Sequence, residues 1–300
     1  MNVLLCGDWP HHEQQAWQAA LAAAMPEAQW LDGAAARAVQ TTVQAAVVAN
    51  PRPGSLLGFD GLRLIQSLWA GVDRLLADTT LPSAVPLARM VDPAMNAAMA
   101  QTALWATLAL HRGFFAYAQR QRQQHWLAHS QRRADELQVT LLGQGEMGRS
   151  VSTCLAQQGY RVEGWRRDGA ALWPLLSRSD IVINLLPLTL QTSGLLDARF
   201  FAALPAKASL VNLARGAHVV DADLLAALDR GHLRHAVLDV FHTEPLPAAH
   251  PFWRHPLVTV LPHAAAATDV RSAAAVAVAN LRALRDGQPL RHLVDRGRGY

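Results

Sequence analysis

The chain has very little cysteine. Its 300 residues include only two, Cys6 and Cys154. The two lie far apart, and neither belongs to the short spacings by which cysteines bind zinc or form redox motifs. Neither a disulfide framework nor a metal site is therefore supported, and we expect both thiols to be small buried hydrophobic groups.

Lysine is almost absent as well. Lys207 is the only one among 27 basic residues, so arginine carries nearly all of the positive charge behind the formal net charge of +4. No stretch is dense enough in arginine to indicate nucleic-acid binding. Residues 120–133 come nearest, but glutamines and a His-Trp-Leu segment interrupt them. We interpret this stretch as the solvent-exposed face of a helix and expect no nucleic-acid partner.

Long apolar runs are also lacking. The longest, residues 97–110, contains a glutamine and two threonines and is too short to cross a bilayer. Residues 1–10 lack the basic start of a secretory signal. We therefore expect a cytoplasmic protein with no membrane partner. With 51% apolar and 17% charged residues, the chain has the composition of a packed globular protein and is long enough for about two domains.

A glycine-rich turn directly follows an apolar run. Residues 139–148 read Val-Thr-Leu-Leu-Gly-Gln-Gly-Glu-Met-Gly, a G-x-G-x-x-G pattern that continues into helix-forming sequence. Gly143 permits the tight turn, Gly145 lets the backbone approach a pyrophosphate, and Gly148 lets the helix pack against the strand. The turn predicts a dinucleotide site, although such a glycine pattern alone also occurs by chance.

Two series of short apolar runs indicate parallel strands, one before the glycine turn and one after it. We interpret the runs of the second series as continuous, as in strands buried on both faces. The expected strands are residues 2–6, 44–49, 62–69 and 86–90 in the first series, and 161–165, 180–186, 208–213, 235–241 and 257–261 in the second. A helical region is expected from Pro93 to about residue 128, and a last helix with Thr268 or Asp269 as N-cap and Gly287 as its stop.

This order predicts an α/β fold with two Rossmann- or flavodoxin-like domains, each a doubly wound parallel sheet, the nucleotide domain being inserted into the substrate domain. We expect residues 95–266 to form the NAD(P)-binding Rossmann domain. Residues 1–94 plus 267–300 would form the substrate-binding (catalytic) domain. The apolar helix at 97–110 suits either a dimer contact or a buried core helix.

Three polar residues follow consecutive strands of the second series. Arg215 ends the segment Val-Asn-Leu-Ala-Arg, Glu244 follows the next strand, and His263 stands in Leu-Pro-His after the last. Open parallel sheets bind ligands at the carboxyl ends of their strands. We therefore expect the three side chains to converge on one site.

Together with the glycine turn, these motifs resemble the D-2-hydroxyacid dehydrogenase family, and within it the glyoxylate/hydroxypyruvate reductase subgroup. Matching segments run from about residue 60 to residue 300. They include Asn-Leu-Leu-Pro at 184–187, Asn-Leu-Ala-Arg-Gly at 212–216, Leu-Asp-Val-Phe at 238–241, Glu-Pro-Leu-Pro at 244–247 and Val-Asp-Arg-Gly-Arg-Gly-Tyr at 294–300. The resemblance implies an NAD(P)-dependent oxidoreductase that acts on the CH–OH group of 2-hydroxy acids.

The resemblance also assigns catalytic roles. His263 would protonate the carbonyl oxygen as hydride arrives, with Glu244 hydrogen-bonded to it. A carboxylate partner fixes the tautomer of an imidazole and favours its protonated form. Arg215 would bind the substrate carboxylate and polarise the carbonyl through a guanidinium fork that lysine lacks.

Residues 68–73, Leu-Trp-Ala-Gly-Val-Asp, resemble the substrate loop of the family, in which main-chain amides hold a carboxylate. Trp69 replaces a glycine expected in close relatives, and Ala49 stands where they tend to carry tryptophan. We hypothesise that the Trp69 indole refills that pocket from another strand. The substrate-binding candidates are Trp69, Ala70, Gly71, Arg215 and His263.

The strand at 161–165 is followed by Arg166, Arg167 and Asp168. By the family pattern, Arg166 occupies the position of the acid that binds the ribose 2′-hydroxyl in NAD-dependent enzymes. Two guanidiniums can instead pair with a 2′-phosphate. This favours NADPH, with NADH through Asp168 as the less favoured cofactor. The resemblance adds further contacts, including Asp239 to the nicotinamide carboxamide. The cofactor-binding candidates are Gly143, Gly145, Glu146, Met147, Gly148, Trp165, Arg166, Arg167, Leu186, Pro187, Thr192, Leu213, Ala214 and Asp239.

The sequence thus predicts NADPH-dependent reduction of small 2-oxo acids, glyoxylate to glycolate and hydroxypyruvate to glycerate, by a homodimer. Two alternatives stay open. One is a dehydrogenase of the same family for a bulkier 2-hydroxy acid, and the other is a non-enzymatic nucleotide-sensing protein similar to a corepressor. The intact arginine, glutamate and histidine set argues against the second alternative.

Overall fold

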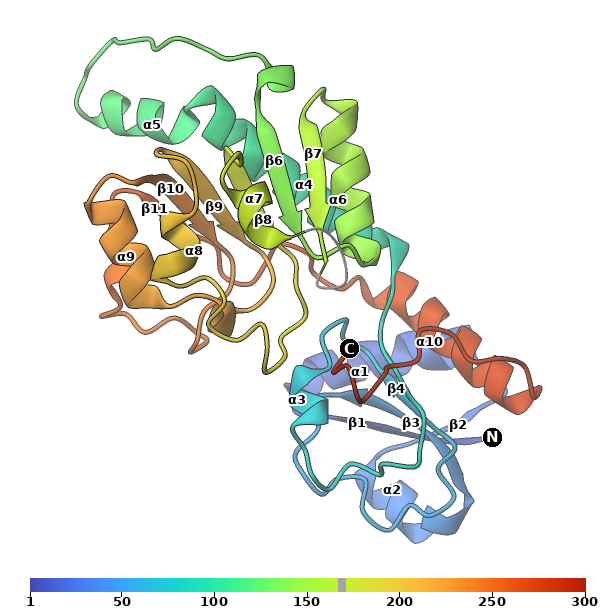
Figure 1. Cartoon of the computed structure of the whole chain (residues 1–300). Coiled ribbons are helices and arrows are strands. Elements are labelled where there is room, and N and C mark those ends of the chain that lie inside the picture. The colour runs from blue at the N-terminus through green and yellow to red at the C-terminus, as the bar shows by residue number, and fades with distance from the viewer. Residues whose placement is uncertain (167–170) are drawn as a thin grey trace. The chain divides into compact units, whose positions relative to one another are not determined.

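Two parallel sheets organise the chain, each in its own unit (Figure 1). The computed structural model describes residues 1–166 and 171–300. One unit consists of Met1–Met95 and Thr268–Tyr300, and the other of Asn96–Ala267. The α/β fold with two doubly wound parallel sheets is confirmed.

The first unit has a five-stranded sheet in the order β2-β1-β3-β4-β5, which is the flavodoxin-like order. Its short strand β2 was not expected from the sequence. Helices α1 and α10 lie on one face of the sheet and α2 on the other (Figure 1). The elements are β1 (Asn2–Gly7), α1 (His11–Ala24), β2 (Gln29–Leu31), α2 (Gly33–Ala38), β3 (Val43–Ala49), β4 (Leu64–Ser67), α3 (Asp73–Leu76), β5 (Leu87–Ala88) and α10 (Val270–Arg285), with a 3-10 turn at Gln40–Thr42.

The second unit has a six-stranded sheet in the order β11-β10-β9-β8-β6-β7. It is entered through α4 (Pro93–Arg112), which begins at the end of the first unit. The elements that follow are α5 (Phe114–Arg122), β6 (Gln138–Leu142), α6 (Glu146–Gln157), β7 (Arg161–Trp165), α7 (Leu172–Leu176), β8 (Ile181–Asn184), α8 (Ala198–Ala202), β9 (Ala208–Asn212), α9 (Asp221–Asp229), β10 (Leu233–Leu238) and β11 (Val258–Val260), with 3-10 turns at Ala134–Glu136, Gly216–His218 and Pro251–Trp253.

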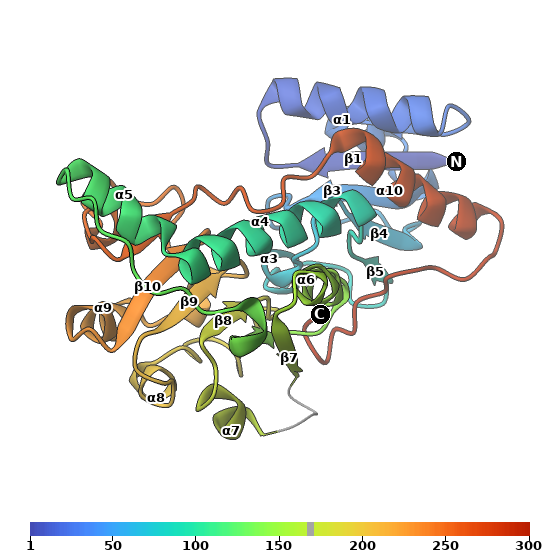
Figure 2. The same ribbon diagram turned by 90° about the horizontal axis from the view of Figure 1, so that it is seen from above.

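Two apolar layers cover this second sheet. One lies between the strands and helices α4 and α6, and the other between the strands and α7, α8 and α9 (Figure 2). Ala103, Ala106 and Leu110 of α4 are buried in the first layer. The apolar pattern at 97–110 is thus largely that of a core helix, although Trp105 on the same helix is 42% exposed.

Two expectations about the second unit were wrong. Strand β7 is not an apolar run buried on both faces, because it lies at the edge of the sheet and Arg161, Glu163 and Gly164 are exposed. The helical region does not reach residue 128. It breaks at Gly113, which adopts a left-handed φ of 72°, and α5 ends at Arg122. Most of residues 120–133 therefore do not form the helical face we expected.

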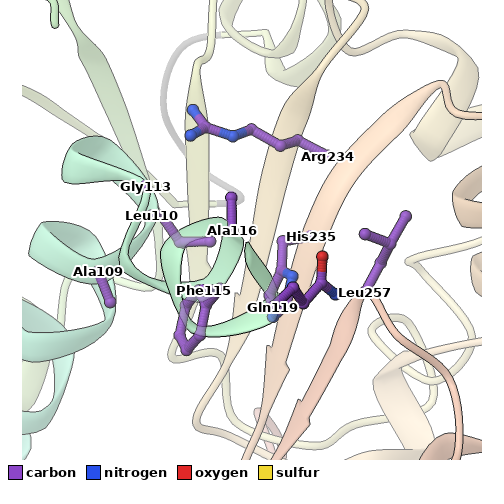
Figure 3. Close-up of a pocket in the computed structure, with 9 residues that line it drawn as sticks. All are labelled: Ala109, Leu110, Gly113, Phe115, Ala116, Gln119, Arg234, His235 and Leu257. Carbon is purple, nitrogen blue, oxygen red and sulfur yellow. The ribbon is translucent and has the colours of Figure 1, made fainter. Parts of the chain in front are cut away.

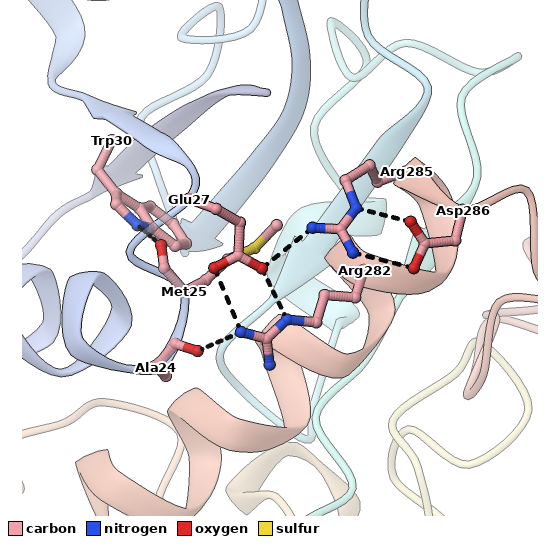
Figure 4. A network of polar contacts seen from close by, with 7 residues as sticks. All are labelled: Ala24, Met25, Glu27, Trp30, Arg282, Arg285 and Asp286. Atoms are coloured by element: carbon pink, nitrogen blue, oxygen red, sulfur yellow. Dashed lines mark hydrogen bonds and ion pairs between the residues drawn. The ribbon is translucent and has the colours of Figure 1, made fainter.

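The last helix is bound to the rest of the first unit by charged side chains (Figure 4). Glu27, after α1, accepts from Arg282 Nε at 2.9 Å and from Arg285 Nη1 at 3.1 Å. Hydrogen bonding from Arg282 is the main cause that lowers the pKa of Glu27 to about 2. The helix begins as expected, since Asp269 is its N-cap and accepts from two amides, and Gly287 follows its end at a φ of 65°.

Both cysteines are free and half-buried, which is less buried than expected. Burial raises the pKa of the Cys6 thiol. Among the described residues, no helix combines the length and the apolar character needed to span a membrane.

Candidate active site

The glycine turn connects β6 to α6 and has the geometry of an anion-binding helix start. Gly143 adopts a φ of 102°, and a Cβ at Gly148 would lie 2.1 Å from the Gly143 oxygen, so both positions require glycine. A Cβ at Gly145 would meet nothing within 4 Å. Since the first helical bond joins Arg149 N to Gly145 O, the amides of Glu146 and Met147 have no intrahelical acceptor. Backbone amides at a helix start, beside open space, suit a phosphate.

The end of β7 lies directly beside this turn. The Gly143 amide donates to the Trp165 carbonyl at 2.9 Å. Arg166 follows Trp165 and is exposed. Arg167, the second residue expected to pair with a 2′-phosphate, and Asp168, the expected NADH contact, lie outside the described residues.

The next strand, β8, leads into a tight turn that contains Pro187 and Thr192. Thr192 Oγ1 donates to the Pro187 oxygen at 2.8 Å, and the Thr189 amide donates to Thr192 Oγ1 at 2.9 Å. Leu186, like Leu213 and Ala214 after β9, is buried, so its side chain packs in the core.

Two polar residues at these strand ends were not among the expected site residues. Asn184 and Asn212 are the last residues of β8 and β9, lie opposite each other in the register, and are fully buried. Their side chains hydrogen-bond at 3.0 Å, and Asn184 Nδ2 also contacts Nδ1 of the buried His218 at 2.9 Å. The sequence did contain a signal for them, because an asparagine ends each of two mostly apolar strands.

Arg215 follows β9 on a half-buried segment that is pressed against the loop carrying Glu244. A Cβ at Gly216 would lie 2.0 Å from the Phe241 carbonyl carbon, so the two backbones can approach only because residue 216 is glycine. His242 Nε2 lies 2.8 Å from the Val219 oxygen and joins the same two segments again. The structure thus brings together the segments that carry Arg215 and Glu244.

Glu244 and His263 form a direct pair. His263 Nδ1 lies 2.6 Å from Glu244 Oε2, while Glu244 Oε1 accepts from the Phe241 amide at 2.9 Å. Each carboxylate oxygen therefore has its own partner. The His263 side chain is 53% exposed and can meet a ligand. A histidine oriented by a carboxylate at a strand end is suited to proton transfer.

Asp239 holds the backbone around His263. Its oxygens accept from the Ala264 amide at 2.7 Å and the Ala265 amide at 3.0 Å, and its main-chain oxygen accepts from His263 N at 2.8 Å. His263 adopts a φ of 53°, which non-glycine residues seldom adopt. Burial raises the pKa of Asp239, while the two amides act in the opposite direction. Three hydrogen bonds thus fix the unusual backbone from which the His263 side chain projects.

In the first unit, the expected substrate loop follows β4. Ser67 Oγ accepts from the Trp69 amide at 3.0 Å, and the Met90 amide donates to the Trp69 oxygen at 3.1 Å. Ala70 and Gly71 are half-buried and precede α3. The Trp69 indole packs edge-on against the buried Trp17, with ring centroids 6.2 Å apart.

A second indole, that of Trp9, which was not among the expected site residues, lies at the same edge of this sheet. A Cβ on Gly7 would lie 2.7 Å from the Trp9 ring and 3.0 Å from the Ala49 Cβ, so Trp9 and Ala49 border the same space. Trp9 also stacks on Trp17 at 6.5 Å. Trp9 is therefore a second candidate, besides Trp69, for the indole that compensates for alanine at position 49.

A small cavity lies in the second unit, away from the candidate site residues of that unit. It has a volume of about 50 Å³ and is enclosed by α4, α5 and the starts of β10 and β11 (Figure 3). Arg234 and His235 line it from the amino end of β10. The candidate active site is built on the carboxyl ends, so this cavity belongs to the opposite edge of the sheet.

Comparison with known proteins points to one family. Residues 104–265 match the family model described as D-isomer specific 2-hydroxyacid dehydrogenase, NAD binding domain. The chain is 39% identical over 320 aligned residues to glyoxylate/hydroxypyruvate reductase A of Serratia proteamaculans, with all of both chains covered.

Solved structures agree with this match. A D-isomer specific 2-hydroxyacid dehydrogenase from Xanthobacter autotrophicus, in complex with NADPH and MES, superimposes with a TM-score of 0.93 at 36% identity, covering 100% of this chain and 99% of that one. An NADPH-dependent glyoxylate/hydroxypyruvate reductase from Sinorhizobium meliloti, in complex with NADP and sulfate, does so with a TM-score of 0.91 at 33% identity and the same coverage.

Proposed function

The chain belongs to the D-isomer specific 2-hydroxyacid dehydrogenase family, and from this membership we propose that it reduces small 2-oxo acids with NADPH, glyoxylate and hydroxypyruvate being the leading substrates. As a family member it is an NAD(P)-dependent oxidoreductase that acts on the CH–OH group of 2-hydroxy acids. The Serratia and Sinorhizobium relatives carry the name of this reductase. The preferred acid and the residue roles below are our proposal.

The residues of the glycine turn fit a dinucleotide. The open space at Gly145 and the amides of the first turn of α6 accommodate a pyrophosphate, and Gly148 lets that helix approach the strand. Arg166 is exposed directly after β7, where it can pair with a 2′-phosphate. Two structural relatives were solved with NADPH or NADP. These observations support NADPH over NADH.

Bound NADPH would supply the hydride that adds to the carbonyl carbon. Arg215 would bind the substrate carboxylate and draw electron density from the carbonyl, and its half-buried position limits competition from water. His263 would donate a proton from Nε2 to the carbonyl oxygen. Its Nδ1 hydrogen would stay on the ring, hydrogen-bonded to Glu244. Positioned proton transfer of this kind contributes about 10²- to 10⁴-fold in rate.

The carboxylate-binding loop of the first unit is proposed to be Trp69, Ala70 and Gly71, with the amides of Ala70 and Gly71 as donors. Hydrogen bonds with Ser67 and Met90 fix the main chain of Trp69. Small residues let the backbone approach an anion closely. The indoles of Trp9 and Trp69 flank Trp17 at the carboxyl edge of this sheet. We propose that these large rings restrict the substituent of the substrate to a small group.

The observation that carries the proposal is the 2.6 Å pair of His263 and Glu244, on a loop pressed against the Arg215 segment. The experiment is to mix purified protein and NADPH with glyoxylate, hydroxypyruvate, and branched or aromatic 2-oxo acids, and to follow the NADPH absorbance. We expect the highest kcat/KM with the two small acids and a lower one when NADH replaces NADPH.

The other outcomes of this panel select the alternatives. Preference for branched or aromatic acids would identify a dehydrogenase for bulkier substrates. NADPH binding without turnover of any acid would favour a nucleotide-sensing protein. Preference for NADH would contradict the role given to Arg166.

The homodimer and the cytoplasmic location stay predictions. Trp105, Phe114 and Trp126 are 42%, 56% and 104% exposed on α4, on α5 and after α5. Contiguous exposed apolar patches often mark protein contacts, so these three side chains are candidates for such a contact. Sedimentation equilibrium would measure the oligomeric state, and a monomer at micromolar concentration would contradict the dimer.

A further inference from the structure

A buried polar cluster lies beneath the ends of β8 and β9. Asn184 and Asn212 end these neighbouring strands, and His218 stands in the turn after Arg215. All three side chains are 0% exposed. Burying a polar group is tolerated when its hydrogen bonds are made, so the partners of each amide reveal its orientation.

Two main-chain donors fix both amides. The Leu186 amide donates to Asn184 Oδ1 at 3.2 Å, and the Ala214 amide donates to Asn212 Oδ1 at 3.3 Å. A main-chain N–H requires an acceptor, so these atoms are the amide oxygens and the nitrogens point the other way. Asn184 Nδ2 then donates to Asn212 Oδ1 at 3.0 Å and faces His218 Nδ1 at 2.9 Å.

This arrangement decides which nitrogen of His218 carries a hydrogen. Nδ1 faces the Asn184 NH₂ group and must offer it a lone pair. Nε2 lies 3.3 Å from the Pro187 carbonyl oxygen, which can only accept, so Nε2 donates. A neutral imidazole with its hydrogen on Nε2 satisfies both neighbours. The other tautomer would oppose donor to donor and acceptor to acceptor.

The network ends at the two segments on which the proposed reaction depends. On one side, Asn212 Nδ2 donates to the main-chain oxygen of Arg215 at 3.0 Å. On the other side, the Pro187 oxygen that faces His218 also accepts from Thr192 Oγ1 at 2.8 Å. An interruption anywhere between would leave a buried polar group without its partner.

We propose that Asn184, Asn212 and His218 are positioning residues that hold the Arg215 main chain and the Pro187 turn in one arrangement, through a histidine of fixed tautomer. The inference rests on the proposed function, in which Arg215 binds the substrate carboxylate and Pro187 borders the cofactor. None of the three touches the reacting atoms in that scheme. They act through the two segments that they join.

The tautomer is measured on the wild-type protein labelled with ¹⁵N-histidine at pH 7, without substrate. Long-range ¹H–¹⁵N spectra distinguish a protonated Nε2 from a protonated Nδ1. We expect the assigned signals of His218 to report a hydrogen on Nε2 and a lone pair on Nδ1. A hydrogen on Nδ1, or on both nitrogens, would overturn the proposal. This test needs no turnover, so it decides the network even if the reductase proposal fails.

The variant Asn184→Asp tests the positioning role with almost no change of shape. Its second carboxylate oxygen would face His218 Nδ1 and require a hydrogen there, and Asn212 Oδ1 would lose the hydrogen bond that Asn184 Nδ2 donates in the wild type. We expect the ¹⁵N signals of His218 to report a hydrogen on Nδ1 in this variant, in place of the lone pair expected there in the wild type. We also expect kcat/KM for glyoxylate to fall by about tenfold or more, because a buried acceptor loses its donor, and the Kd for NADPH to rise.

The matched control is Asn280→Asp in the first unit. Asn280 is 2% exposed, its Oδ1 accepts from the Arg291 amide at 2.9 Å, and its Nδ2 donates to Gln66 Oε1 at 2.7 Å and to Arg291 O at 3.0 Å. This control should lose a similar amount of thermal stability and keep the His218 signals, kcat/KM and Kd of the wild type. If Asn184→Asp stays within twofold of this control in both constants, its role is only structural and the proposal is wrong. If Asn184→Asp does not fold, the wild-type spectrum decides.

Discussion

Replacing Glu244 by glutamine isolates the proton chemistry of the proposed site. Glu244 Oε1 accepts the Phe241 amide hydrogen at 2.9 Å, and Oε2 lies 2.6 Å from His263 Nδ1. In Glu244→Gln the amide oxygen keeps the bond from Phe241, because a main-chain N–H requires an acceptor. The new NH₂ group then faces His263 Nδ1, which must offer a lone pair. His263 is thereby held as the neutral tautomer with its hydrogen on Nε2.

That tautomer is wrong for both directions of the reaction. Reduction needs an imidazolium that gives up the Nε2 hydrogen and retains the one on Nδ1, and oxidation needs an unprotonated Nε2. Loss of a charge-assisted hydrogen bond costs about 1.5–3 kcal/mol, or about 10- to 150-fold in rate. A histidine held in the wrong tautomer costs about 10⁴-fold in a serine protease. Because the His263 and Glu244 side chains are 53% and 34% exposed, water weakens the effect. We expect kcat to fall about 10²-fold.

The assay is reduction of glyoxylate at saturating NADPH, together with NADPH binding to the free protein and thermal unfolding. Only kcat should change, since Glu244 does not belong to the proposed cofactor contacts. Glu163→Gln is the control, because Glu163 is an exposed glutamate of the same unit that pairs with Arg178. Retention of more than a third of the wild-type kcat in Glu244→Gln would refute the reasoning. A parallel loss of NADPH affinity would mean that the substitution disturbs the fold.

Three further outcomes are expected. Arg166→Ala should raise KM for NADPH by about tenfold or more without changing KM for NADH. Arg161 is also exposed, and the control Arg161→Ala should change neither KM. Equal effects of Arg166→Ala on both cofactors would contradict a 2′-phosphate contact. Burial, aided by nearby positive charge, lowers the pKa of His235 to about 4. Between about pH 6.5 and 4 the unfolded chain therefore binds a proton at this histidine that the folded chain does not. The free energy of unfolding should fall by up to about 3 kcal/mol as the pH drops through this range. His235→Gln, which can still reach Thr259, should flatten that part of the denaturation profile, and an unchanged slope would count against the lowered pKa. Trp9→Ala should raise kcat/KM for branched 2-oxo acids relative to glyoxylate, and a constant ratio would remove Trp9 from the pocket.

Local features of the sequence predicted most of the fold. The glycine turn at 143–148 is contiguous, and both the left-handed φ of Gly143 and the contact of Gly148 with the Gly143 oxygen arise within one β-turn-α unit. Buried strands such as β3 and β8 are apolar because both of their faces are covered. Because strands and helices alternate along the chain and such connections are right-handed, a doubly wound parallel sheet was the expected arrangement.

The wrong expectations share a cause. Strand β7 was expected to be buried on both faces as one of a series of continuous apolar runs, yet it lies at the sheet edge, a place that depends on the final strand order. The helix after Pro93 was extended to residue 128 because no proline stops it, but Gly113 takes up a left-handed conformation and residues beyond Arg122 leave the helix. In both cases the residue types of the segment itself did not reveal where tertiary packing would place the strand or end the helix.

Some features of the candidate site could also be predicted from the sequence, and others could not. Arg215, Glu244 and His263 could be named from the sequence because each follows a strand in a recognisable motif, and parallel strands end at one edge of the sheet. The contact of Gly216 with Phe241 and the 2.6 Å pair of Glu244 with His263 join residues 19 or more positions apart, and only the packed chain fixes them.

The sequence by itself determined the α/β class, the glycine turn, the family and the three polar residues at the strand ends, because these depend on neighbouring residues and on a repeated strand-helix order. Only the tertiary structure decided that Asn184 and Asn212 orient His218, and that Trp9 lies beside Ala49. Hydrogen-bond direction and ring contact depend on atoms a few ångströms apart, which the chain brings together from distant positions only when its sheets have formed.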